Sequence, residues 1–267
     1  MTRWRPTPFL WLSLALHAAV PGLLLWRWSW WPLWLGLLGL NHLVIMLQGL
    51  WPRSTWLGPN LRRLPAAAAA RGEVALTIDD GPNPDVTPQV LDLLARHGAR
   101  ATFFCIGERA QAQAALCQRL VAEGHEVGNH GQQHRLDSAL MGLAGWRREV
   151  GEGAATLAAL TGQRPVFYRA VAGLRNPWLS PVLVETGLQL ASWTRRGFDT
   201  RCGEADVVLA RLTRGLAAGD ILLLHDGHVA RTPEGQPVIL AVLPRLLDEL
   251  ARRGLKAVTL TQACNPL

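Results

Sequence analysis

The stretch Val74-Ala-Leu-Thr-Ile-Asp-Asp-Gly-Pro82 ends an apolar run in two adjacent carboxylates and then turns. The apolar and β-branched residues up to Ile78 are typical of a buried strand. A turn often carries one Asp for local hydrogen bonding, but Asp79 and Asp80 side by side each raise the cost of ionising the other. Two such residues at the end of a buried strand therefore indicate a functional site.

Around this stretch, short apolar runs alternate with longer amphipathic runs from Glu73 onward. Short runs rich in β-branched residues indicate strands, and apolar residues at helical spacing indicate helices. We expect strands at 74–78, 101–106, 126–128, 166–169, 189–193, 221–224 and 257–260. We expect helices at 87–97, 108–122, 143–160, 178–185, 204–216 and 238–253. About seven such units predict parallel strands, in an open sheet or a barrel, and a barrel carries its chemistry at the carboxyl ends of its strands.

Polar side chains fall at five of these strand ends, beginning with Asp79 and Asp80. His130 and His134 follow the third strand. Their spacing would place both imidazoles on one side of a helical turn, as a divalent transition metal requires. The remaining ends carry Arg169, Trp193 and the run His225-Asp226-Gly227-His228. A single histidine at a strand end is more often structural than functional, but five such ends together predict one polar site.

The first 65 residues follow a different pattern. Residues 8–25 and 31–50 carry no charged side chain. As helices rising about 1.5 Å per residue, each would cross a hydrocarbon core of roughly 30 Å. The tryptophans of Trp26-Arg-Trp-Ser-Trp-Trp31 between them suit a membrane interface. We therefore predict a transmembrane helical hairpin over residues 1–65, with a cleaved signal peptide as the alternative.

Charge also separates this segment from the rest of the chain. Seven of the 27 basic residues and none of the 20 acidic residues precede Glu73, so the net charge of +7 belongs to the first 72 residues. This distribution predicts a lipid bilayer as partner and no nucleic acid. Arginines flank the outer ends of the hairpin, which favours a multi-pass protein of a bacterial-type inner (plasma) membrane with both chain ends in the cytoplasm. Residues 66–72 are expected to be a linker and 73–267 a catalytic domain.

Three motifs resemble those of the polysaccharide deacetylases, carbohydrate esterase family four. They are Thr77-Ile-Asp-Asp-Gly-Pro82, His130-x-x-x-His134 and Leu223-Leu-His225. They occur in the family's order and spacing, and the resemblance covers roughly residues 73–260. It implies a distorted (β/α) barrel and a metal-dependent hydrolase that removes N-acetyl groups from amino sugars.

The resemblance also implies a role for each polar residue. Asp80, His130 and His134 would bind a divalent transition metal, zinc or cobalt, and leave positions open for water and the acetyl oxygen. Asp79 would be the general base that takes a proton from the attacking water. His225 would be the general acid that protonates the departing amine.

Two further motifs match the family more loosely. Arg169 takes the place of an arginine that orients the catalytic Asp. However, Arg169-Ala-Val-Ala-Gly173 lacks the prolines and the aromatic residue that usually follow the arginine. This loop, with Gly173, would form one wall of the substrate groove, so the identity of the substrate is left undetermined. Trp193 would form an aromatic wall of the substrate site. Asp199 is expected either to tune His225 or to serve as a simple loop residue.

The sequence thus predicts a membrane-anchored, metal-dependent N-deacetylase of a polysaccharide or glycan. The same centre would suit deacylation or deformylation of a lipid-linked amino sugar at the cytoplasmic membrane face. A catalytically degenerate carbohydrate-binding module would have lost Asp79 or His225, yet both are present. An iron oxygenase with two histidines and one carboxylate needs no general base beside the metal.

Overall fold

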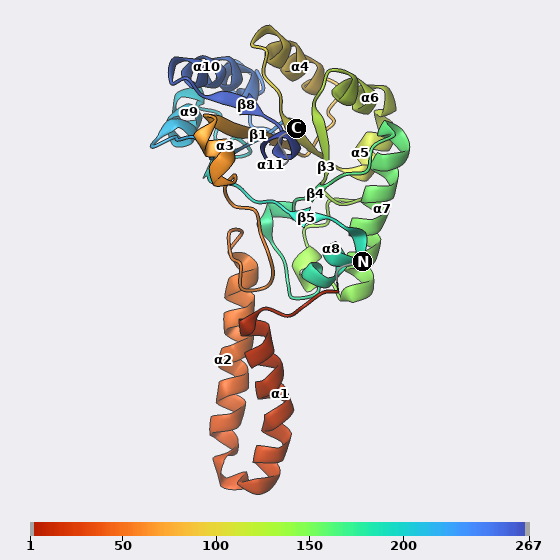
Figure 1. Ribbon diagram of the computed structural model, residues 1–267, viewed down its shortest axis with the longest axis vertical. Coiled ribbons are helices and arrows are strands. Elements are labelled where there is room, and N and C mark those ends of the chain that lie inside the picture. The colour runs from red at the N-terminus through yellow and green to blue at the C-terminus, as the bar shows by residue number, and fades with distance from the viewer. Residues whose placement is uncertain (1–2, 265–267) are drawn as a thin grey trace.

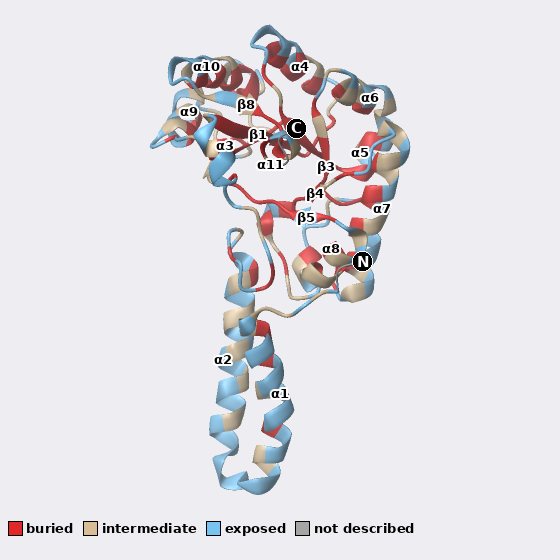
Figure 2. Ribbon diagram, in the orientation of Figure 1, coloured by how far each residue is buried: buried red, intermediate tan, exposed pale blue. Residues whose placement is uncertain are grey.

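The computed structural model describes residues 3–264, and a helical hairpin projects from one end of an α/β body (Figure 1). Helix α1 (Pro8–Trp26) and helix α2 (Trp31–Leu50) are joined by the 3₁₀ turn η1 (Trp28–Trp30). Both helices are long and apolar enough to cross a membrane. Their surfaces are largely exposed (Figure 2). The helix bounds agree with the predicted spans, and an exposed apolar surface of this kind marks an interaction site.

Polar contacts join the two hairpin helices. Asn41 Nδ2 donates a hydrogen bond to Ser13 Oγ at 2.9 Å, and the His17 and His42 rings lie 5.0 Å apart. Hydrogen bonds between helices are favoured where lipid replaces water, because an unpaired amide is costly there. Polar side chains therefore help to hold the two helices of the hairpin together.

Seven strands follow one another across a curled parallel sheet in the order β5–β4–β3–β2–β1–β7–β6, and β8 lies beside the start of β1. Their bounds are β1 Glu73–Asp79, β2 Thr102–Cys105, β3 Glu126–Asn129, β4 Phe167–Tyr168, β5 Gln189–Leu190, β6 Arg195–Arg196, β7 Ile221–His225 and β8 Lys256–Val258. The strand predicted at 189–193 ends at Leu190 as β5, and β6 follows at Arg195–Arg196, outside the predicted range. These two strands form the opposite edges of the sheet. This curled parallel α/β fold fits the expected (β/α) barrel.

Helices connect the strands and cover the outer face of the sheet (Figure 1). They are α4 Thr87–Arg96, α5 Gly107–Ala112, α6 Ala114–Ala122, α7 Leu143–Thr161, α8 Leu179–Thr186, α9 Ala205–Thr213 and α10 Val238–Arg252, with 3₁₀ turns η2 Ser138–Leu140 and η3 Val171–Gly173. Helix α3 (Ala66–Ala70) precedes β1 and helix α11 (Leu260–Cys264) follows β8, and both contribute to the core on the inner face of the sheet. Two further predictions are wrong in part. The helix expected at 108–122 breaks at Gln113, where the backbone leaves helical geometry, and the strand expected at 257–260 ends at Val258.

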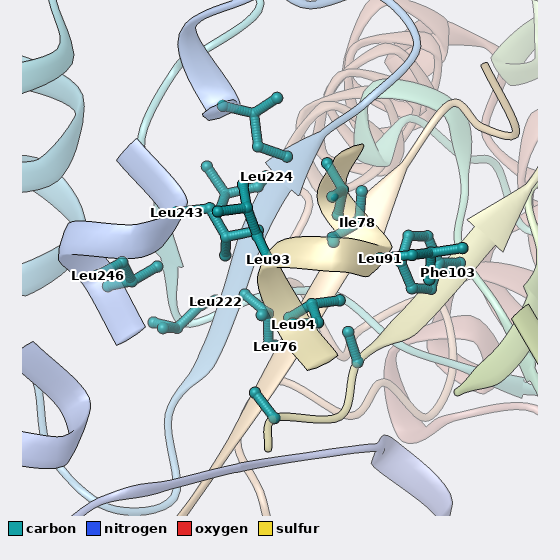
Figure 3. Packing of buried hydrophobic residues seen from close by; sticks show 14 of the residues in the cluster. Leu76, Ile78, Leu91, Leu93, Leu94, Phe103, Leu222, Leu224, Leu243 and Leu246 are labelled. Carbon is teal, nitrogen blue, oxygen red and sulfur yellow. The ribbon is translucent and has the colours of Figure 1, made fainter. Parts of the chain in front are cut away.

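The outward side chains of the central strands build the largest core (Figure 3). Leu76 and Ile78 of β1 are fully buried there in one cluster with Leu243 of α10. Each such aliphatic side chain contributes about 1.5–3 kcal/mol on burial. Strand residues alternate between faces, so Asp79 points to the opposite, inner face, where it is paired in register with His225 of β7. Packing of the outward side chains thus leaves two predicted site residues side by side at the carboxyl ends of β1 and β7.

The segment between the hairpin and β1 packs along the body. Leu64 is buried, and Leu61 pairs with Ala191 in a parallel bridge next to β5. The predicted linker at 66–72 contains α3, in which Ala68 is fully buried. These contacts fix the base of the hairpin against the sheet.

Candidate active site

Asp79, the last residue of β1, is held by a buried arginine. Arg169 Nη1 donates to Asp79 Oδ1 and to Thr77 Oγ1, each at 2.7 Å. Other guanidinium N–H groups donate to the carbonyl oxygens of Ala191 at 3.1 Å and Ser192 at 2.9 Å. A guanidinium bonded on several sides has little freedom to move. Arg169 therefore fixes the position of Asp79 through Oδ1.

Asp80 lies where two imidazoles meet. Asp80 Oδ1 is 3.0 Å from His134 Nε2 and 3.2 Å from His130 Nε2, and one ligand atom from each of the three residues lies within 4.8 Å of the others. Burial opposes ionisation, but hydrogen bonds from the imidazoles outweigh it and hold the pKa of the Asp80 carboxyl well below its usual value. Asp80 is therefore ionised, as a metal ligand has to be.

His130 is aimed at this centre through its second nitrogen. Its Nδ1–H donates to the carbonyl oxygen of Arg169 at 2.8 Å, which leaves Nε2 facing Asp80. Histidine ligands of metals are commonly oriented by such a bond. Burial opposes charging of the ring, but Asp80 and Asp79 outweigh it and raise the pKa of His130. A metal that binds at Nε2 therefore displaces a proton, so acid weakens its binding.

The three side chains fit a divalent transition metal. Two imidazole nitrogens and one carboxylate oxygen form a common set of protein ligands in catalytic zinc sites, which keep a further position open. Two conditions for such a site are met here, since the ligand atoms converge and the buried His130 has its orienting partner. Asp80, His130 and His134 are therefore the residues that would hold the ion.

The histidine pair lies in a loop after β3, so the helical turn predicted for this pair is wrong. Gly131 and His134 have positive φ angles of 85° and 58°, and the ring centroids of His130 and His134 are 5.1 Å apart. Glu149 of α7 anchors the loop from below. Its Oε1 accepts the backbone N–H groups of Gln133 and His134, each at 3.0 Å. The buried carboxylate of Glu149 thus brings the two imidazole rings together, whereas the sequence pattern had suggested that a helical turn does so.

Glu149→Ala is expected to lower the affinity for zinc about tenfold, because two backbone N–H groups lose their acceptor and the loop that carries His134 loosens. Glu149→Gln should recover most of the affinity, since its amide oxygen can still accept both bonds. Competition with a chromophoric chelator measures the affinity. Glu152→Ala, at an exposed position on the same helix, is the control. If Glu149→Ala bound zinc as tightly as this control, the proposed anchoring would be contradicted.

His225, the last residue of β7, is backed by a buried carboxylate. Its Nδ1–H donates to Asp199 Oδ1 at 2.9 Å, and its backbone N–H donates to Asp199 Oδ2 at 2.7 Å. Burial opposes charging of the ring, but Asp199 outweighs it and raises the pKa of His225. This arrangement fixes the ring and favours its protonated form.

A pocket of about 330 Å³ opens at the carboxyl ends of the strands. The predicted residues that line it are Asp79, Asp80, His130, His134, Trp193 and His225. Arg169 and Asp199 lie outside the pocket lining and are hydrogen-bonded to Asp79 and His225. Six of the predicted site residues therefore face one pocket, and Arg169 and Asp199 are each bonded to one of them.

Gly173 occupies a different place from the other predicted residues. It lies beside the pocket wall formed by Val171 and Ala172, which line the cavity. A Cβ atom at Gly173 would lie 2.4 Å from Pro52 Cβ and 3.0 Å from the Trp193 ring, and its φ angle is 75°. Glycine is therefore required for close packing of this wall against the base of the hairpin.

Two residues near Asp80 were not predicted as site residues. His228 Nδ1 lies 3.2 Å from Asp80 Oδ2, and Arg109 Nη1 donates to the Asp80 carbonyl oxygen at 2.7 Å. Gly227 permits this approach, because a Cβ there would lie 2.2 Å from the same carbonyl oxygen. His228 could have been found from the sequence, because it follows the strand-end residue His225 by only three positions. Nothing in the sequence around Arg109, which lies on α5, marks it as a site residue.

Comparison with known proteins finds related sequences and a related solved fold. The family model described as Polysaccharide deacetylase matches residues 66–191. A peptidoglycan-N-acetylglucosamine deacetylase of Bacillus cereus is 32% identical over 78% of this chain and 91% of its own length. A chitooligosaccharide deacetylase of Sinorhizobium fredii is 34% identical over 73% of this chain and 93% of its own length. A crystal structure of a peptidoglycan N-acetylglucosamine deacetylase matches with a TM-score of 0.69 at 27% identity, covering 77% of this chain and 92% of that one.

These matches span nearly the whole length of the two relatives and of the solved structure, and the family model covers strands β1 to β5. Deacetylases of this family depend on a metal, and this chain has an Asp–His–His cluster at the pocket. The chain therefore belongs to the polysaccharide deacetylase family and is a hydrolase that acts on carbon–nitrogen bonds other than peptide bonds.

Proposed function

We propose that this protein is a membrane-anchored, metal-dependent hydrolase that releases acetate from N-acetylated amino sugars of a glycan. One observation carries the proposal. A metal-binding cluster, a carboxylate held by an arginine and an imidazole held by a second carboxylate all face one pocket. Amide hydrolysis needs an activated water, a proton acceptor and a proton donor for the amine, and these groups can supply all three.

A divalent transition metal, zinc or cobalt, bound by Asp80, His130 and His134 would act as a Lewis acid on the acyl oxygen and make the attacking water more acidic. Asp79 accepts the proton of that water in this proposal. Its Oδ1 is occupied by Arg169, so proton transfer falls to Oδ2, which lies 4.0 Å from His130 Nε2. Arg169 therefore serves as a positioning residue.

His225 is the proton donor in the same scheme. When the carbon–nitrogen bond breaks, the amine leaves as a strong base and needs a proton. Nδ1–H of His225 is bonded to Asp199, which leaves Nε2 to deliver the proton. The raised pKa of His225 keeps the ring charged at a higher pH than that of an ordinary histidine.

Asp199→Asn is expected to move the basic limb of the pH–rate profile to lower pH. Activity requires protonated His225, so it is present below the pKa of this ring and lost as the pH rises through it. Because Asp199 raises the pKa of His225, its neutralisation lowers that pKa and shifts the limb downward. The profile of kcat/KM against pH measures the shift. A uniform loss of rate with an unmoved limb would contradict this role for Asp199.

The substrate class in this proposal follows from the relatives. Those named above are deacetylases of peptidoglycan N-acetylglucosamine and of chitooligosaccharide, which supports an N-acetylglucosamine unit as the reacting sugar. Trp193, Leu223 and Val171 provide apolar and aromatic surface in the pocket. Such surface suits a sugar ring and an acetyl methyl group.

The anchor in this proposal is the α1–α2 hairpin. Its exposed large side chains include Trp11, Leu25, Leu40 and Met46, which water would solvate poorly. A signal sequence would pass the same test of length and composition as α1, but α2 would still remain as an apolar span. We assign the protein to the inner membrane with both ends cytoplasmic. A reporter fused after the last residue that is active only in the periplasm would contradict this orientation.

Acetate release tests the proposed activity. Full-length protein in detergent, loaded with zinc or cobalt, should release acetate from N-acetylglucosamine oligomers or peptidoglycan fragments. Chelation should stop the release, and added metal should restore it. Protein that holds the metal yet releases no acetate from any of these sugars would contradict the proposal.

A further inference from the structure

Exposed apolar side chains gather on one side of the catalytic pocket. Among the described residues of the α/β body, five large apolar side chains are clearly exposed: Leu136, Leu140, Trp178, Phe198 and Val207. Leu136, Leu140 and Trp178 are 75%, 87% and 51% exposed. Exposed side chains of this size indicate a contact surface when they cluster.

Hydrogen bonds join the segments that carry Leu140 and Trp178. Asn176 Nδ2 donates to the carbonyl oxygens of Ala139 at 2.9 Å and Met141 at 2.7 Å, on either side of Leu140. Asn176 Oδ1 accepts the backbone N–H of Trp178 at 3.0 Å. The loop that contains η2 and the start of α8 are thereby held together.

The same surface is continuous with the base of the hairpin. The backbone N–H of Arg175 donates to the Gly49 carbonyl oxygen at 3.1 Å, and Trp4 Nε1 donates to Ser180 Oγ at 3.2 Å. The Arg175 guanidinium also donates to the Ser54 carbonyl oxygen. In Figure 1 the hairpin projects from the end of the body where α8 and the start of α7 lie. The hairpin is thus bonded directly to the segments that carry the exposed side chains.

The catalytic pocket opens beside this surface. Leu136 lines the pocket, as do Val171 and Ala172 of the wall that packs on Pro52 through Gly173. Pro52 is only two residues beyond the end of α2, so at most about 7 Å of extended chain separates them. A bilayer that contains the hairpin would therefore lie next to the pocket mouth.

We propose that an interfacial rim holds the pocket mouth at the surface of the bilayer, and that the substrate is an N-acylated amino sugar carried on a membrane lipid. The rim consists of Leu136, Leu140, Trp178, Trp51 and Trp56. The inference rests on the proposed function and its anchor. Indole rings favour the membrane–water interface, and Trp51 and Trp56 are exposed at the base of the hairpin.

Charge at the same end of the molecule supports a lipid surface as the occupant. Arg3, Arg5 and Arg53 are exposed beside the ends of the hairpin, and no acidic residue precedes Glu73. Basic side chains next to a membrane span attract anionic lipid headgroups. Phe198 differs from the rim residues, because Arg196 and Arg211 lie over its ring at 5.1 and 5.6 Å.

Quenching by nitroxide-bearing lipids tests the rim without any need for activity. A fluorophore is attached to full-length protein in liposomes at Leu140→Cys, Val207→Cys or Leu43→Cys, with Cys202 and Cys264 replaced by serine. Leu43 lies in α2, and Val207 is an exposed apolar residue of α9 outside the rim. Strong quenching is expected for the labels at positions 43 and 140, with little for the label at position 207. Quenching of the label at position 43 with none at position 140 would overturn the rim alone. No quenching at 43 would overturn the anchor and the rim with it.

Activity on two substrates tests the lipid-linked sugar. With Leu140→Asp/Trp178→Asp, kcat/KM on a synthetic N-acetylglucosamine glycolipid in liposomes should fall about tenfold, because acidic side chains oppose interfacial docking. On a soluble N-acetylglucosamine oligomer it should stay at the wild-type level. Val207→Asp is the matched control and should change neither rate. Equal losses on both substrates, or no loss on either, would overturn the inference. A wild type inactive on both would instead overturn the proposed function.

Discussion

Asp79→Asn is expected to reduce kcat/KM for acetate release by roughly 10²–10⁴-fold, the usual contribution of a general base, while the bound zinc stays at the wild-type level. The amide cannot accept the proton of the attacking water. Arg169 can still donate to the Asn oxygen as it donates to Asp79 Oδ1, so the fold around the site should persist. Steady-state kinetics and metal analysis of the same full-length preparation measure the two effects.

The separation of rate from metal content is what makes this variant informative. Asp79 is adjacent to Asp80 but lies outside the Asp–His–His cluster. Asp85→Asn, at an exposed position after the same strand, controls for the loss of one negative charge near the site. Full activity of Asp79→Asn would contradict the assignment of the base. Loss of zinc from this variant would show that Asp79 is a metal ligand instead.

His130→Ala is expected to lose tightly bound zinc and, with it, essentially all activity. His130 is buried, its Nε2 faces Asp80, and its Nδ1–H is satisfied by the Arg169 carbonyl oxygen. Removal of the ring deletes one of three ligands and leaves that carbonyl without its donor. Because changes at residues that merely orient ligands already cost 10–100-fold in affinity, removal of a ligand should cost roughly 100-fold or more.

Zinc content after gel filtration and acetate release measure these two losses for His130→Ala. His97→Ala is the matched control, since His97 lies at the end of α4 and outside the residues that line the pocket. It should retain both zinc and activity. A His130→Ala variant that kept stoichiometric zinc would contradict the proposed ligand set.

Much of this site could be predicted because parallel strands bring their carboxyl ends to one edge. Asp79 and His225 are far apart in sequence, yet they are direct partners in the register of β1 and β7. Arg169 follows β4 and reaches Asp79 across the inside of the sheet. A polar residue at the carboxyl end of a predicted parallel strand can therefore be assigned to the site before the structure is known.

The parts that could not be predicted depend on contacts between distant segments. The spacing of His130 and His134 suggested a helical turn, but the rings converge because Glu149 of α7 holds the loop from a different element. Strand β6 is two residues long and is defined by its pairing with β7, so no local pattern marks it. Arg109 reaches the Asp80 carbonyl oxygen from α5, and its sequence surroundings resemble those of any surface arginine.

Anomalous diffraction at the zinc edge, from crystals of zinc-loaded full-length protein, tests the central claim most directly. One peak is expected within roughly 2.0–2.2 Å of a carboxylate oxygen of Asp80 and of Nε2 of His130 and His134, with Asp79 outside bonding distance. A peak bound by other residues, or one in which Asp79 takes the place of Asp80, would contradict the account.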